Sequence, residues 1–204
     1  MKKRVLATVL ALGSVVLVGC GSDEPTPAPT APGVEAATEP PASPSAATGE
    51  TSERGNLVKE LGEPAGFLAA GSDERVLTFA VKDIEVDPAC TGEFAGEPEV
   101  GHFVAVDIEA ETAAQPTFDE AMQGQDYQFN PFSWKFIDAN GTTANSVTSD
   151  GTYSCFSEAE TLPDMIGAAE RVTGKLVLDI PTTEGILVYE DPISGTAWEW
   201  NIPA

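Results

Sequence analysis

The sequence predicts an all-β protein in which two antiparallel sheets pack face to face. Apolar residues recur at every second position in short runs, which is typical of strands with one buried face. Gly, Pro, Asn and Asp separate these runs, and the best helical pattern is short, from Thr117 to Met122. Because the aromatic residues fall on several strands and need a second sheet to cover them, a β-sandwich is the expected architecture.

The expected strands follow one another along residues 57–204. The run 76–86 is apolar at alternate positions in both halves, but the halves are out of phase, so we expect a β-bulge near Lys82 and Asp83. A hairpin turn is expected at Asn140-Gly141. The other alternating runs are 104–108, 132–136, 176–180 and 198–202.

The first 19 residues have the parts of a secretory signal peptide: a basic start, an apolar core too short to span a bilayer, and small residues at the end. The segment ends in Leu17-Val18-Gly19-Cys20, which resembles a bacterial lipobox. The resemblance implies cleavage before Cys20 and attachment of a diacylglyceryl group and palmitate to this residue. Two or more acyl chains give stable anchoring, so we expect a protein on the extracytoplasmic face of the cell membrane. A plain secreted protein is the alternative.

Residues 20–56 are rich in Pro, Ala and Thr and contain no aromatic residue. Such a segment cannot bury enough apolar surface to fold, so we expect a disordered linker after the lipidated Cys20. Residues 57–204 are long enough for one stable core and are expected to form one domain.

Charge and composition exclude several functional classes. The formal charge is −23, with 33 acidic and 10 basic residues, which argues against a nucleic-acid partner. One His and three Cys exclude zinc sites built from several of these residues, and no cofactor is expected. His102 has no recognisable nucleophile motif near it and is expected to be an exposed residue without a catalytic role.

Five stretches resemble a secreted, immunoglobulin-like (telokin-like) domain of unknown function that occurs in Gram-positive lipoproteins and exported antigens. They are KELGEPAGF at 59–67, VLTFAVKDIEVDPAC at 76–90, GHFVAVDIEAET at 101–112, FIDANGTT at 136–143 and AAERVTGKLVLDIP at 168–181. The resemblance implies an immunoglobulin-like sandwich and an exported location, and it carries no catalytic residue. The usual Pro-Gly turn of the family is replaced here by Ala168-Ala169.

Cys90 and Cys155 remain once Cys20 is lipidated. Both lie in loop-like sequence outside the reducing cytoplasm, so we expect a disulfide between them. Free thiols or a redox pair are the alternatives.

Two expected strands carry alternating carboxylates. If the strands are neighbours, these side chains would lie together on one face, either as a solvated surface or as a weak calcium site. We expect the solvated surface. The carboxylates are Asp83, Glu85, Asp87, Asp107, Glu109 and Glu111.

The remaining candidates are aromatic. Trp134, Trp198 and Trp200 are expected in the core, with a ligand groove as the alternative. The segment 113–130 is long for a loop and is the favoured binding surface. We therefore expect a non-enzymatic, membrane-anchored extracellular lipoprotein that binds or organises an unknown protein or cell-wall component. A hydrolase that acts on an envelope polymer is the alternative.

Overall fold

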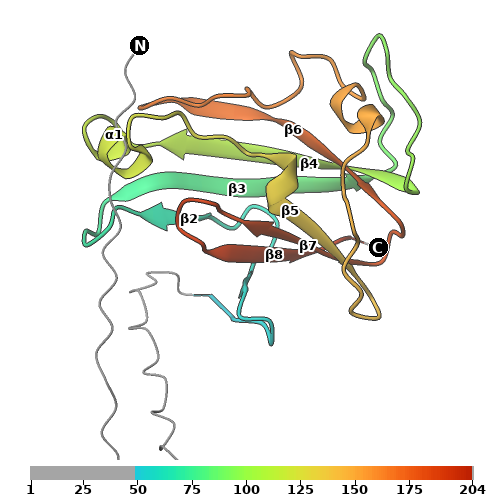
Figure 1. Cartoon of the computed structure of the whole chain (residues 1–204), viewed down its shortest axis with the longest axis horizontal. Coiled ribbons are helices and arrows are strands. Elements are labelled where there is room, and N and C mark those ends of the chain that lie inside the picture. Colours follow the sequence, from blue (N-terminus) through green and yellow to red (C-terminus); the bar gives the residue numbers. More distant parts are fainter. Residues whose placement is uncertain (1–48, 204) are drawn as a thin grey trace, which may run out of the picture. The chain divides into compact units, whose positions relative to one another are not determined.

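The computed structural model describes residues 49–203, so the signal segment 1–19, Cys20 and the linker up to residue 48 lie outside the described part. Figure 1 shows two sheets packed face to face. One contains β1 (Leu57–Val58), β8 (Ala197–Asn201), β7 (Gly185–Glu190) and β5 (Trp134–Asp138), in that order. The other contains β2 (Ala65–Leu68), β3 (Arg75–Val86), β4 (His102–Thr112) and β6 (Arg171–Ile180). Short helices are α1 (Thr117–Met122), η1 (Pro131–Ser133) and η2 (Asp150–Tyr153).

The predicted all-β antiparallel sandwich is confirmed. All neighbouring strands are antiparallel except the short β1, which runs parallel to β8. The orders β3-β4-β6 and β5-β7-β8 match the A-B-E and C-F-G orders of constant immunoglobulin domains when β3 to β8 are taken as strands A, B, C, E, F and G. The segment between β5 and β6 contains no strand where that fold has strand D.

Two local predictions are confirmed and one is wrong. The β3–β4 register shifts between Val81 and Asp83, at the expected bulge. The predicted helix is α1, with its expected bounds. Phe132 was expected in a strand, but it lies in η1 and its exposed fraction is 75%. Asn130 accepts a hydrogen bond from the Phe132 N–H and Pro131 begins η1, so this local turn overrides the alternation and the strand starts at Trp134.

Aromatic side chains fill the space between the sheets. Phe79 makes edge-on contacts with Trp198 and Tyr189 at centroid distances of 5.2 and 5.7 Å. Trp134, Trp198 and Trp200 are at most 3% exposed, which confirms their predicted place in the core.

The segment 113–130 contributes to this core, because its three aromatic residues, Phe118, Tyr127 and Phe129, are all buried. Tyr127 pairs with Ile166 in an isolated bridge and is 1% exposed. Its hydroxyl donates to Asp191 Oδ1 at 2.8 Å, which leaves the Tyr189 hydroxyl to donate to the Tyr127 oxygen at 2.6 Å. The Ser194 backbone N–H and hydroxyl donate to the other oxygen of Asp191. The polar groups of the Tyr127–Tyr189–Asp191 network are thus paired inside the sandwich.

Residues 49–56, assigned above to the linker, contact β1 and β8. The Val58 N–H donates to the Glu50 carbonyl at 2.8 Å, and the Asn56 amide donates to Glu199 Oε2 at 2.9 Å. In residues 49–203, no helix is long and apolar enough to cross a membrane.

The turn at Ala168-Ala169 keeps a geometry that suits glycine. Ala169 has φ of +59°, a left-handed conformation that costs an L-residue about 1–2 kcal/mol, and its N–H donates to the Ala113 carbonyl. We expect Ala169→Gly to raise the free energy of unfolding by about 0.5–1 kcal/mol, as measured by urea denaturation. The control Ala168→Gly should lower it. Loss of stability in Ala169→Gly would show that this strain does not exist.

Candidate functional site

A disulfide joins two loops at one end of the sandwich. Cys90 and Cys155 are bonded, with 4.5 Å between their Cα atoms, which confirms the predicted pair. Figure 1 shows the loop between β3 and β4 (green) beside the segment that contains η2 (orange). We name residues 90–101 and 149–158 the stapled lobe. The Thr91 and Gly92 N–H groups both donate to the Cys155 carbonyl, at 2.8 and 2.9 Å.

A glycine allows the two loops to approach so closely. A Cβ atom at Gly92 would lie 2.1 Å from the carbonyl oxygen of Ser154. The lobe covers part of the outer face of β4 and β6, where a second small core forms. Its buried residues are Phe103, Ala105, Cys155, Phe156 and Val177.

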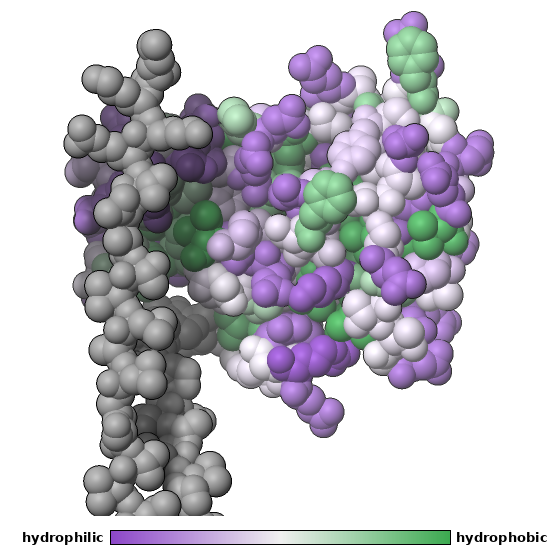
Figure 2. Space-filling view, in the orientation of Figure 1, coloured by the Kyte–Doolittle hydropathy of each residue, from purple (hydrophilic) through white to green (hydrophobic). Residues whose placement is uncertain are grey.

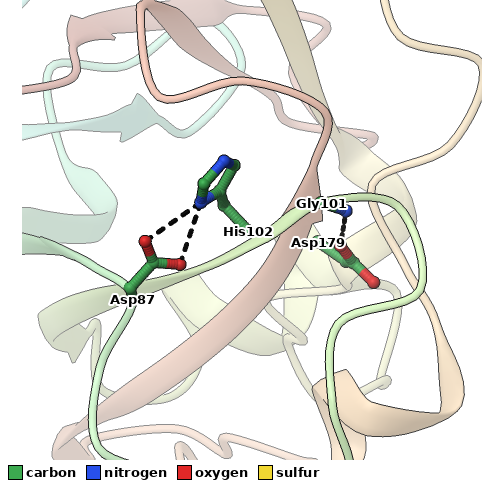
Figure 3. Close-up of polar contacts among 4 residues, drawn as sticks. All are labelled: Asp87, Gly101, His102 and Asp179. Atoms are coloured by element: carbon green, nitrogen blue, oxygen red, sulfur yellow. Dashed lines mark hydrogen bonds and ion pairs between the residues drawn. The ribbon is translucent and has the colours of Figure 1, made fainter.

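Asp179 fixes the base of the lobe. It lies on β6 and is fully buried, and its carboxylate accepts hydrogen bonds from three successive backbone N–H groups. The donors are Glu99 at 2.7 Å and Val100 and Gly101 at 3.2 Å; Figure 3 shows the contact with Gly101. These hydrogen bonds to a buried carboxylate hold the end of the 90–101 segment against β6.

His102 and Asp87 form a second polar contact at the base (Figure 3). The His102 Nδ1 atom lies 3.0 and 3.1 Å from the two carboxylate oxygens. Both side chains are partly exposed, as expected for His102. Among the described residues, no hydroxyl or thiol forms a hydrogen bond with this histidine, so the pair lacks the nucleophile of a catalytic triad. It instead connects the end of β3 to the start of β4.

The lobe exposes apolar groups among carboxylates. Phe94 is 80% exposed, Tyr153 60% and Val100 42%. Neither segment of the lobe contains Lys or Arg. Figure 2 shows apolar groups (green) projecting from a largely hydrophilic surface on the face in view. The exposed carboxylates of the lobe are Glu93, Glu97, Glu99, Asp150 and Glu158.

Five of the six carboxylates of the calcium hypothesis lie on the neighbouring strands β3 and β4, and Asp87 directly follows β3. Asp83 is directly opposite Asp107, but four of the six pair with a basic side chain. In residues 49–203, no group of three or more acidic, His or Cys side chains is close enough to hold a metal ion. The pairs are Lys82–Glu109, Lys175–Asp107, Arg171–Glu111 and His102–Asp87.

These pairs give a prediction for calcium. We expect millimolar CaCl2 to change the melting temperature by the same amount as NaCl of equal ionic strength, within about one or two degrees, because both salts act by screening. A bound ion would instead add about 2.7 kcal/mol at a hundred times its dissociation constant. A saturable rise of several degrees with calcium, lost in Asp107→Asn or Asp83→Asn, would reject the solvated-surface interpretation.

Comparison with known proteins gives no family. No protein-family model matches the chain, and no curated protein matches it. Among solved structures, the chain is similar to the yjhA protein from Bacillus subtilis, with 17% sequence identity and a TM-score of 0.40. The similarity covers 70% of this chain and 98% of that protein.

Proposed function

We propose that the protein is a non-enzymatic, lipid-anchored immunoglobulin-like domain of the cell envelope, whose stapled lobe binds a positively charged protein. The observation that carries this proposal is the exposure of Phe94 and Tyr153 on a rigid acidic support. The resemblance of the strand sequence to secreted immunoglobulin-like lipoprotein domains agrees with the strand order. Cys20 and the linker supply the anchor and the distance from the membrane.

The physical argument rests on preorganisation. Binding costs less when loops are ordered beforehand, and the lobe is held by the disulfide, the Cys155 carbonyl and Asp179. Exposed aromatic side chains supply most of the energy in many interfaces. A surrounding set of carboxylates without Lys or Arg selects a cationic partner and accelerates its association at low salt.

Incubation with envelope fractions distinguishes a binding function from the activity of a hydrolase. We expect the fractions to retain protein prepared without its lipid anchor at low salt, to release it as NaCl shortens the Debye length to about 3 Å at 1 M, and to yield no cleaved polymer. Phe94→Ala combined with Tyr153→Ala should abolish most retention, whereas the exposed control Leu61→Ala should not. Catalytic release of polymer fragments would support the hydrolase instead.

The anchor has its own test. We expect Cys20→Ala to release the protein into the medium or to leave an unprocessed precursor, because no acylated residue would then hold it. Partitioning into detergent, measured for wild type and variant, is the readout. Equal partitioning of the two proteins would contradict the anchor and leave the lobe proposal standing.

A further inference from the structure

A groove lies between β5 and the segment 143–148, at the edge of β5 that faces away from β7. Its volume is about 280 Å³, just below the roughly 300 Å³ at which pockets for drug-sized ligands begin. This volume suits a single small ring. The lining residues are Phe132, Trp134, Lys135, Thr143, Ala144, Asn145, Ser146, Val147 and Thr148.

The wall opposite β5 is fixed at both ends. The Ala144 N–H donates to the Phe136 carbonyl at 2.9 Å, and the Val147 carbonyl accepts from the Asp179 N–H at 2.8 Å. Val147 is buried in the main core. The segment 143–148 thus passes from one sheet to the other, so the groove is formed before any ligand binds.

The lining is polar but almost uncharged. Thr143, Asn145, Ser146 and Thr148 supply hydroxyl and amide groups, and Phe132 supplies a ring that is 75% exposed. The ammonium group of Lys135, the only ionic side chain in the lining, pairs with Glu190. No carboxylate lines the groove, although the chain has 33 acidic residues.

Unpaired backbone groups at this edge point to a ligand with its own donors and acceptors. The Trp134 Nε1 donor is buried and has no hydrogen-bond partner among the described residues. The carbonyl of Phe136 points away from β7. In a strand, the N–H of the same residue and the carbonyl of the residue two positions earlier point the same way, so the Phe136 N–H and the Trp134 carbonyl also face this edge. In residues 49–203, neither the Phe136 N–H nor the Trp134 carbonyl has a hydrogen-bond partner. A hydroxyl group of a bound ligand can accept from the Phe136 N–H or donate to the Trp134 carbonyl.

We propose that this groove binds one ring of a neutral glycan. The Phe132 ring packs against the apolar face of the sugar, and the hydroxyl and amide side chains of segment 143–148 bind its hydroxyl groups. A peptide strand added to the β5 edge fits less well. The Phe136 carbonyl already accepts from Ala144, so only the Phe136 N–H and the Trp134 carbonyl are free to pair with a peptide backbone. This site shares no residue with the stapled lobe, although the segment 143–148 leads directly into it, and the proposal does not depend on the proposed role of the lobe.

Titration of the ¹⁵N-labelled full chain tests the proposal, with maltohexaose, cellohexaose and glucose as neutral probes and hexagalacturonate as a charged control. We expect a saturable shift of the Trp134 indole signal with a neutral probe, at a dissociation constant near 1 mM, which corresponds to about −4.1 kcal/mol. If the groove binds a terminal ring, glucose alone should shift the Trp134 signal. If it binds an internal ring, only the hexamers should shift it. Hexagalacturonate should bind at least about tenfold more weakly, because both partners are acidic.

Variants of exposed residues test whether the glycan binds in this groove. Phe132→Ala and Asn145→Ala should each weaken binding by about tenfold or more, with unchanged melting temperatures, while the matched aromatic control Tyr153→Ala leaves it unchanged. The proposal is overturned if no neutral probe shifts the Trp134 signal at tens of millimolar, if Phe132→Ala binds as well as wild type, or if an extended peptide competes for the groove more strongly than the glycans.

Discussion

Replacing Cys90 and Cys155 with Ala is expected to lower the free energy of unfolding by about 4 kcal/mol. The disulfide closes a loop of 65 residues, and in the chain-entropy model its removal gives the unfolded chain that much additional entropy. Cys155 is also fully buried against Phe103, Phe156 and Val177, so its loss loosens the small core beneath the lobe. Urea denaturation measures the change.

Two comparisons make this prediction specific. Dithiothreitol should destabilise the wild type by a similar amount and leave the double variant unaffected. Hydrogen exchange should accelerate at Thr91 and Gly92, whose N–H groups bind the Cys155 carbonyl, and also at Tyr189 in the core, whose amide exchanges through global unfolding. Equal stability of wild type and double variant would show that the lobe is held without its disulfide.

High pH is expected to destabilise the protein steeply. Burial raises the pKa of both Tyr127 and Tyr189 above the ordinary value, and the nearby Asp191 charge adds to the increase. Above about pH 10 the unfolded chain loses these two protons and the native state keeps them, so the unfolded state binds fewer protons. The free energy of unfolding should fall by roughly 1.4 kcal/mol per pH unit for each tyrosine.

The three tyrosines allow a direct check by ultraviolet titration of phenolate. Tyr127 and Tyr189 should keep their protons in the native protein near pH 10, whereas all three phenols should ionise in urea. Tyr127→Phe combined with Tyr189→Phe should remove the steep alkaline slope even though it lowers stability at neutral pH. Ionisation of three phenols in the folded wild type near pH 10 would contradict the buried network.

The predictions that succeeded depend on local pattern or on elimination. The bulge at Lys82 and Asp83 follows from a change of phase within one strand, and the disulfide was predicted because two cysteines remain once Cys20 is assigned to the lipobox-like motif. Phe132 was assigned wrongly because Asn130 and Pro131 form a local turn that ends the alternation. The strands of the sandwich were therefore predictable wherever the alternation of apolar residues and the positions of turn-forming residues indicate the same strand boundaries.

The candidate site was less predictable, because its parts come together through tertiary structure. Asp179 alternates with apolar residues as a solvent-facing strand residue would, but the lobe folds over that face and buries it. The contact between Asp87 and His102 needs the β3–β4 pairing, which places the two ends of a long loop together. Likewise, Arg171 and Lys175 reach the carboxylates only because β6 is the neighbour of β4.

Photo-cross-linking from position 153 in intact cells tests the proposed lobe function most directly. With Tyr153→p-benzoylphenylalanine, we predict a covalent adduct with a basic envelope protein that decreases strongly in Glu93→Gln/Glu97→Gln/Glu99→Gln and persists in the control Glu109→Gln. The same probe at Leu61, outside the lobe, should give no such adduct. Equal adducts from positions 153 and 61, or an adduct from 153 that is insensitive to the lobe carboxylates, would contradict the lobe as the binding surface.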